Sequence, residues 1–244
     1  MWLGVLYGNL RTMRYAWLIW SLLSLVPWSI VYFSLQSGEK KREMLVVSLW
    51  TALIGITEPF FVPLYWSPPS LFDLALRTGF DIESFIFSFG IGGIAIVAYD
   101  RIFRMRDKKV PPHERMSSRH RYHLLALISA PVIFVTLFFT APLNPIHSAI
   151  IAMIAGGLAT WYCRPDLKSK MFASALIFLG IYFVYFQVLI ALYPGYVEQV
   201  WNLKALSGVL VLGIPLEELL FAASFGFLWS SVYEHFAWRK LKQL

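Results

Sequence analysis

The sequence has one cysteine, Cys163, among 244 residues, and only 14% of its residues are charged. A single cysteine excludes an intrachain disulfide and a metal cluster held by several thiolates. The charged fraction lies well below the quarter that is usual in soluble domains. The glycines of residues 89–97 do not spell GxGxxG, so we do not expect a dinucleotide-binding loop.

Apolar residues are abundant instead, because 58% of the chain is hydrophobic, 17% is aromatic and the mean hydropathy is +0.63. A helix needs roughly 20 apolar residues to cross a bilayer, and a spanning segment must pair its own backbone groups. These features predict an all-α polytopic membrane protein. We expect about seven transmembrane helices, at residues 16–35, 45–65, 82–99, 124–143, 147–163, 171–194 and roughly 209–235.

The basic residues are distributed unevenly between the two sides of these spans. Seventeen of the 21 Lys and Arg residues fall on the side that holds the C-terminus. The positive-inside rule therefore predicts a multi-pass protein of the cell membrane, with the C-terminus in the cytoplasm and the N-terminus outside. We interpret the basic segment 101–123 as a cytoplasmic orienting loop, so no nucleic-acid partner is expected.

Two parts of the sequence match each other at a constant offset of 134 residues. The match between residues 79–100 and 213–234 pairs Gly79 with Gly213, Glu83 with Glu217, Phe87 with Phe221, Tyr99 with Tyr233, and Asp100 with Glu234. Upstream, at an offset of 135, Pro59 pairs with Pro194 and Trp66 with Trp201. Self-similarity at a fixed offset is typical of internal repeats.

The repeat predicts how the chain is divided. Residues 1–100 would form a first three-helix unit, residues 101–143 the basic loop and a connecting helix, and residues 144–244 a second three-helix unit. A single connecting span gives both units the same orientation, which is the parallel 3+1+3 arrangement also known from transporters. We expect an active cavity between the units.

Glutamates occur within the apolar spans of both units. Glu83 and Glu217 share a helical face with the phenylalanines four residues further on, Phe87 and Phe221. A charge that faced lipid at this depth would cost several kcal/mol, so these carboxyl groups should face the protein interior and are expected to be functional. Glu58 precedes Pro59, which kinks a helix, and could line the same site.

The second unit resembles the membrane carotenoid cyclases of the lycopene cyclase domain type. The resemblance rests on the PLEE motif at residues 215–218, the LLF run that follows it, and the pair Tyr233–Glu234. Because both units take part, the chain resembles the fused two-copy form of the family. The first unit departs from the motif, with Asp81 in place of the proline and Ser84 in place of the second acid.

This resemblance implies an enzyme, an intramolecular lyase or isomerase, that cyclises a linear carotenoid such as lycopene without net redox change and without a cofactor or metal. The terminal double bond is protonated, the ring closes, and a proton is lost. Adjacent carboxyls cannot both ionise cheaply, so one holds a proton. We assign Glu217 as the acid and Glu218 as the group that tunes it, with Glu83 or Glu58 as the base.

The same chemistry passes through carbocations, which aromatic faces attract. We expect four aromatic residues to contact the substrate, namely Phe87, Phe221, Trp66 and Trp201. The partners implied are a hydrophobic polyene taken from the bilayer and the membrane lipid, and a homodimer is left open. Tyr99–Asp100 and Tyr233–Glu234, at the cytoplasmic helix ends, are interpreted as structural caps or loop anchors.

The sequence argues against two other classes of membrane protein. Residues 209–235 contain no lysine for a retinal Schiff base, and no two aspartates are spaced DxxD as a diphosphate-binding prenyltransferase requires. His113, His120 and His123 could hold a metal, but without an evident fourth ligand we interpret them as part of a solvated loop. A carrier or transporter of a lipid or small organic ion, or another isoprenoid-modifying enzyme, stays an alternative.

Overall fold

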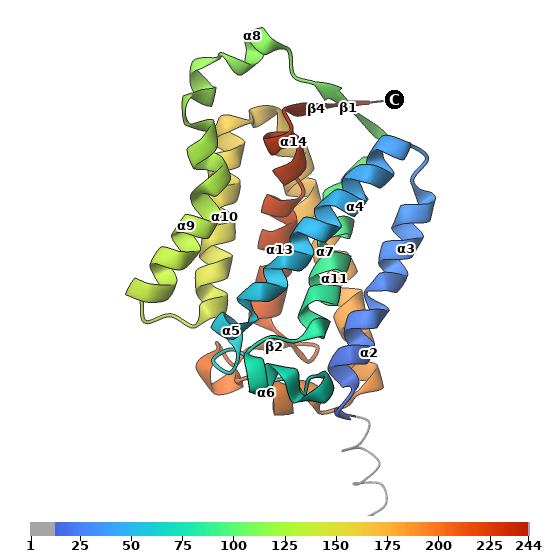
Figure 1. Cartoon of the computed structure of the whole chain (residues 1–244), viewed down its shortest axis with the longest axis vertical. Helices are drawn as coiled ribbons and strands as arrows, with labels where there is room; N and C mark the ends of the chain where they lie inside the picture. Colours follow the sequence, from blue (N-terminus) through green and yellow to red (C-terminus); the bar gives the residue numbers. More distant parts are fainter. Residues whose placement is uncertain (1–12, 244) are drawn as a thin grey trace, which may run out of the picture.

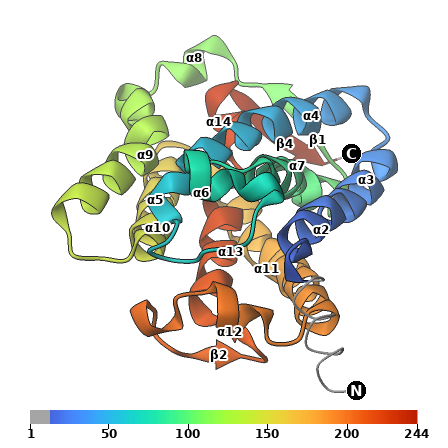
Figure 2. The same cartoon turned by 60° about the horizontal axis from the view of Figure 1, so that its bottom comes forward.

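The computed structural model describes residues 13–243, and these form a bundle of long helices with short elements at its two ends (Figures 1 and 2). Within residues 13–243, six segments are long and apolar enough to cross a membrane. The prediction of an all-α membrane protein is therefore confirmed, while the count of seven spans and the 3+1+3 repeat stay predictions. The six segments are 16–34, 38–61, 82–102, 118–140, 145–163 and 165–192.

The first two of these segments are each divided into shorter helices along their length. Helix α2 ends before Ser24, whose hydroxyl donates to the Ser21 carbonyl, and α3 continues the same segment. The second segment tightens into a 3₁₀ turn, η1, ahead of Pro59 in α5. Their bounds are α2 Ala16–Leu23, α3 Leu25–Ser34, α4 Gly38–Ala52, η1 Leu53–Thr57 and α5 Glu58–Phe61.

The remaining long helices have fewer interruptions, and short elements connect them. The long helices are α7 Ile82–Ile102, α9 His123–Thr140, α10 Pro145–Cys163, α11 Lys168–Leu192 and α13 Leu216–Trp229. The short helices are η2 Leu71–Asp73, α6 Leu74–Thr78, α8 Pro112–Arg115, η3 Ser118–Tyr122, η4 Pro165–Leu167, α12 Tyr196–Val200, η5 Leu203–Ala205 and α14 Val232–Phe236.

Helix α7 lies at the centre of the N-terminal half and contacts α2, α3, α4 and α11. Its glycines permit this close packing. A Cβ atom at Gly92 would overlap with the Thr51 side chain, and one at Gly93 would overlap with Ser48 of α4. Small residues of this kind let membrane helices approach closely, and the same glycines therefore have a packing role.

The segment expected to span at residues 209–235 is less regular than predicted. Residues 210–215 form a hairpin of β2 Leu210–Val211 and β3 Ile214–Pro215, and α13 begins only at Leu216. Gly213 turns the chain with a φ of +84°, and Pro215 has no N–H to donate to a preceding helical turn. At 1.5 Å per residue, the 14 residues of α13 extend about 21 Å, and α14 continues beyond the break at Ser231.

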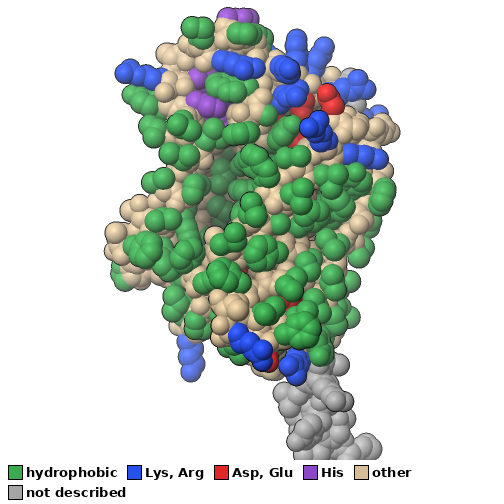
Figure 3. Space-filling model, viewed as in Figure 1, with side chains coloured by type: hydrophobic (Ala, Val, Ile, Leu, Met, Phe, Trp, Pro, Cys, Tyr) green, Lys and Arg blue, Asp and Glu red, His purple; other side chains and the backbone are tan. Residues whose placement is uncertain are grey.

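The basic segment 101–123 is not a simple solvated loop. Strand β1 Met105–Lys109 pairs antiparallel with β4 Arg239–Gln243 near the end of the chain, so that Met105 lies opposite Gln243. This small sheet joins the two halves at one end of the bundle (Figure 1). Figure 3 shows hydrophobic side chains over the middle of the molecule, with most Lys and Arg gathered at the end that carries this sheet.

Candidate functional site

An apolar cavity of about 330 Å³ lies within the bundle. Its wall combines residues from α2, α7, α11 and α13 with residues from η1, α9 and α10. Figure 3 shows a hollow lined by hydrophobic side chains between α9 and α4. Six of the residues singled out from the sequence line this cavity, namely Glu58, Trp66, Phe87, Trp201, Glu218 and Phe221.

Glu218 is the most extensively hydrogen-bonded acid of the cavity and is only 6% exposed. It lies in the first turn of α13. Its Oε2 accepts a hydrogen bond from the Tyr182 hydroxyl at 2.5 Å, and its Oε1 accepts one from Trp201 Nε1 at 2.9 Å and one from the Tyr65 hydroxyl. Three donors from three separate segments thus hold both carboxylate oxygens, and such hydrogen bonds lower the cost of burying a charged carboxylate.

The neighbouring Glu217 has a different environment and does not line the cavity. Its Oε1 accepts a hydrogen bond from the Ser207 backbone N–H at 2.7 Å, and His147 Nε2 lies 3.5 Å from the same oxygen. Glu83, its counterpart in α7, accepts from the Leu71 N–H at 2.7 Å. In both cases the glutamate fixes the loop that precedes its own helix.

Glu58 lies in α5, is 7% exposed and lines the cavity beside Ser84 and Trp66. Among residues 13–243, no hydrogen-bond partner is found for its Oε1. Ser84 is the position at which the first unit lacks the second acid of the motif. Glu58 thus brings a carboxyl group from another helix to the place where that acid is missing.

Aromatic rings form much of the cavity wall. The backbones of Trp66 and Trp201 meet in an antiparallel bridge, with their ring centroids 5.3 Å apart. Trp17 contacts Trp66 edge-on at 4.6 Å, and the Phe87 ring lies 5.5 Å from Trp17. Phe221 lies opposite, with its ring centroid 6.2 Å from that of Tyr182. Trp66 and Trp201, which the sequence paired at an offset of 135, therefore touch each other in the wall of the cavity.

Several residues of this site were missed by sequence reasoning. They are Trp17, Trp20, Tyr65 and Tyr182. No short motif marks them, because each lies in an apolar run that contains several other aromatic residues. The only available signal was that Tyr65 directly precedes Trp66, one of the residues of the repeat.

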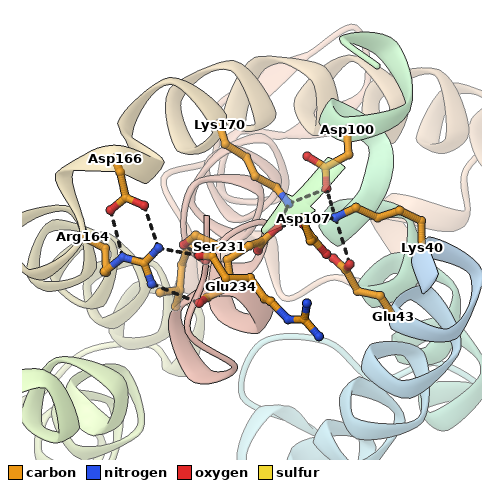
Figure 4. Close-up of polar contacts among 11 residues, drawn as sticks. Lys40, Glu43, Asp100, Asp107, Arg164, Asp166, Lys170, Ser231 and Glu234 are labelled. Atoms are coloured by element: carbon orange, nitrogen blue, oxygen red, sulfur yellow. Dashed lines mark hydrogen bonds and ion pairs between the residues drawn. The ribbon is translucent and has the colours of Figure 1, made fainter. Parts of the chain in front are cut away.

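A second polar cluster is buried at the end of the bundle that carries the small sheet (Figure 4). Lys40 Nζ lies 2.9 Å from Glu43, 2.6 Å from Asp100 and 2.7 Å from Asp107. Lys170 Nζ lies 3.0 Å from Asp100 and also pairs with Glu234. These contacts tie α4, α7, β1, α11 and α14 together. Asp100 and Glu234, interpreted above as caps or loop anchors, both form ion pairs with Lys170.

The neighbouring charges in this cluster explain the ionisation of Asp107, which lies on β1 outside the spans. Burial alone would raise the pKa of its carboxyl group. The ammonium group of Lys40 and a hydrogen bond with Glu43 outweigh burial and hold the pKa of Asp107 below its ordinary value. Asp107 is therefore ionised at neutral pH and contributes to the ion pair.

Two groups of side chains in the described part of the chain have the composition of a metal site. In the first, Glu43, Asp100 and Glu234 converge, but the lysine ammonium groups already occupy the positions of a cation. In the second, His120, His123 and Cys163 converge. The prediction that the histidines belong to a solvated loop is thus wrong for His120 and His123, which pack against the end of α10.

Comparison with known proteins gives one result. The model of the lycopene cyclase family matches residues 144–236 of this chain. The matched range begins just before α10 and includes both glutamates of α13, Tyr182 and Trp201. No curated protein and no solved structure gives a significant match.

Proposed function

Because residues 144–236 carry a lycopene cyclase domain, we propose that the chain is an integral membrane carotenoid cyclase that closes the linear end group of a lycopene-type polyene into a ring. The observation that carries the proposal is the convergence of Glu58 and Glu218 on one apolar, aromatic-walled cavity. Its volume of about 330 Å³ lies at the lower end of the range for small-ligand sites, so it suits one end group of a long polyene.

The two acids of the cavity differ in a way that suggests their roles. Burial in apolar surroundings favours the protonated form of a carboxyl group, and hydrogen bonds to its oxygens oppose this preference. Oε1 of Glu58 has no hydrogen-bond partner among residues 13–243, whereas both oxygens of Glu218 accept hydrogen bonds. We therefore assign Glu58 as the acid and Glu218 as the base. This assignment replaces Glu217, whose partner is a loop N–H, as the proton donor.

The proposed reaction is an isomerisation in which one proton enters and one proton leaves. The Glu58 carboxyl group gives its proton to the terminal C=C bond, which leaves a tertiary carbocation. The next alkene supplies its electron pair to form the ring C–C bond and moves the positive charge into the ring. Glu218 then accepts a proton from a ring carbon, and the released electron pair forms the ring double bond. Carbon is neither oxidised nor reduced overall.

The environment of Glu218 suits this intermediate. When it is ionised, the Glu218 carboxylate attracts a cation in this low-dielectric cavity much more strongly than it would in water. Trp66, Phe87 and Phe221 present aromatic rings to the same space, and each ring face attracts a desolvated cation by up to about 2 kcal/mol. The apolar wall also excludes water, which would otherwise trap the carbocation as an alcohol.

A polyene can reach the cavity from the side. Three cavity residues, Ala130, Pro131 and Phe134, belong to α9, and none of the α9 side chains is buried. Ile54 and Thr57 border the cavity on the opposite helix. We propose that the end group enters between α9 and the second apolar segment while the rest of the polyene stays among the lipid tails.

The orientation follows from the same distribution of charge. We propose that the end with β1 and β4 faces the cytoplasm, because Lys and Arg gather there (Figure 3). A phosphatase or fluorescent-protein fusion at Leu244 tests this orientation. Fluorescence without phosphatase activity is expected, and the reverse result would contradict it.

The cyclase proposal is tested by expressing the whole chain in a lycopene-accumulating bacterium and separating the pigments by chromatography. A cyclic carotenoid is expected from the wild type, and none from Glu58→Gln or Glu218→Gln. Immunoblotting of the membrane fraction controls for insertion. Unchanged lycopene in cells whose membranes contain the wild-type protein would refute the proposal for this substrate and would favour the carrier alternative.

A further inference from the structure

Three histidines and the only cysteine of the chain lie together where α9 begins and where α10 and α14 end. His120 and His123 are three residues apart, on η3 and at the first position of α9. Cys163 is the last residue of α10, and His235 belongs to α14. Distant parts of the sequence thus contribute the ligand types that zinc prefers, which are imidazole nitrogen and thiolate sulfur.

The distances between the ligand atoms match those expected around a tetrahedral zinc ion. His120 Nδ1 lies 3.4 Å from Cys163 Sγ, and His123 Nδ1 lies 3.5 Å from the same sulfur. With Zn–N bonds of about 2.0–2.1 Å and a Zn–S bond of about 2.3 Å, a tetrahedral ion holds its nitrogen and sulfur ligands about 3.6 Å apart. The ligand atoms of all three residues lie within 4.8 Å of one another.

His235 supplies an independent observation. Its side chain is fully buried, and its Nε2 has no hydrogen-bond partner among the described residues. The His235 ring stands perpendicular to that of His123, with the centroids 4.4 Å apart. Its other nitrogen, Nδ1, lies 3.3 Å from Thr160 Oγ1. A proton on Nδ1, donated to this hydroxyl oxygen, leaves the lone pair on Nε2 free, which is the usual outer-shell arrangement of a metal-binding histidine.

The surroundings are those of a closed structural site. The Trp238 ring stacks on His123 at 4.0 Å and meets His120 edge-on at 4.9 Å. The chain adopts a φ of +53° at Trp238, a conformation that is rare for a bulky residue, to hold the ring there. The neighbouring Arg164 is engaged by Asp166 and by two backbone carbonyls.

We propose that His120, His123 and Cys163, whose ligand atoms converge, bind one Zn²⁺ ion, and that the unpartnered Nε2 of the neighbouring His235 moves in as the fourth ligand when the ion binds. Binding forms three Zn–N bonds and one Zn–S bond, and the thiol proton is released to solvent. Four protein ligands leave no open position, so the ion has a structural role and not a catalytic one. This proposal does not depend on the cyclase activity.

Such an ion has a clear task in this fold. Helix α9 has no buried side chain and packs mainly on α10, yet it forms one side of the entrance to the cavity. The ion would fix the first turn of α9 to the end of α10 and to α14. The entrance would then keep its width although α9 is otherwise surrounded by lipid.

The test uses the full chain purified in detergent micelles. Zinc content is measured by elemental analysis, and Co²⁺ replaces Zn²⁺ for spectroscopy, because a thiolate ligand gives a charge-transfer band and a tetrahedral site gives intense ligand-field bands. About one metal ion per chain and both sets of bands are expected of the wild type. A wild-type protein without stoichiometric zinc or cobalt would overturn the proposal, whatever the variants do.

The variants assign the ligands. Cys163→Ser is expected to lose the charge-transfer band. His123→Gln and His235→Gln should weaken Co²⁺ binding by at least about 100-fold, because the loss of even an outer-shell partner costs 10- to 100-fold. His113→Gln, an exposed histidine of the same segment, is the matched control and should bind as the wild type does. Retention of the charge-transfer band in Cys163→Ser, or unchanged affinity in both histidine variants, would overturn the proposal.

Discussion

The adjacent glutamates of α13 allow a sharp test of the proposed mechanism, because Glu217 and Glu218 have different partners. In Glu218→Gln, an amide nitrogen replaces one of two oxygens that together accept three hydrogen bonds. Trp201 Nε1 can only donate, and at least one donor must lose its acceptor or turn away. A buried donor left unsatisfied costs about 1–3 kcal/mol, so the variant should still fold but be less stable.

The effect on the reaction should be larger than the effect on stability. The glutamine cannot accept a proton, and general acid–base groups contribute about 10²- to 10⁴-fold to the rate. This range corresponds to about 2.7–5.5 kcal/mol of transition-state stabilisation. In Glu217→Gln, by contrast, the amide oxygen can still accept from the Ser207 N–H, so both folding and turnover should stay close to those of the wild type.

The assay is the initial rate of cyclic product formation in membranes that contain equal amounts of each variant, with lycopene supplied in lipid vesicles. Thermal unfolding in detergent measures stability separately. A stable Glu217→Gln protein without activity, together with an active Glu218→Gln protein, would refute the assignment of Glu218. It would return the catalytic role to Glu217.

Three further predictions concern the aromatic wall, the buried ion pairs and the helix packing. Tyr182→Phe removes one donor to Glu218. The cyclisation rate should fall by about 10- to 150-fold, because a hydrogen bond to a charged group is worth about 1.5–3 kcal/mol, and the amount of folded protein should not change. Lys170→Met removes one of the lysines that pair with Asp100 and Glu234, so the free energy of unfolding should fall by about 3–5 kcal/mol. Thermal or chemical unfolding measures this change, and an unchanged unfolding midpoint would contradict a stabilising role for these ion pairs. Gly92→Leu should separate α7 from α4, so that size-exclusion chromatography no longer gives a monodisperse peak. Gly180→Leu is the control and should be tolerated, because a Cβ atom at Gly180 would meet no atom within 4 Å.

The sequence determined the class of the protein and most of its helices. Apolar runs that can cross a bilayer leave few alternatives to helices, because backbone groups must be paired within the segment. Helix ends were less exact: α10 begins at Pro145, with Asn144 as its N-cap, whereas the span was predicted to begin at residue 147. The hairpin before α13 was not predicted, because its residues are as apolar as those of a span and only the turn at Gly213 interrupts them.

The site was accessible to sequence reasoning only in part. Repeat matching and the PLEE motif drew attention to Trp66, Trp201 and the α13 glutamates, and the described cavity contains three of these four residues. The motif could not distinguish Glu217 from Glu218. One residue of helix turns a side chain by about 100°, and only the packing of α13 decides which carboxyl group meets Tyr182 and which meets a loop.

Contacts between distant residues were beyond the reach of the sequence altogether. Tyr65 and Tyr182 are ordinary members of aromatic runs until three segments bring them to Glu218. His123 and Cys163 are 40 residues apart in the chain, and nothing local distinguishes them from residues of a solvated loop and an apolar helix end. Hydropathy and propensity act over short stretches and so determined the helices, whereas the meeting of these side chains depends on how the helices pack, which only the tertiary structure decides.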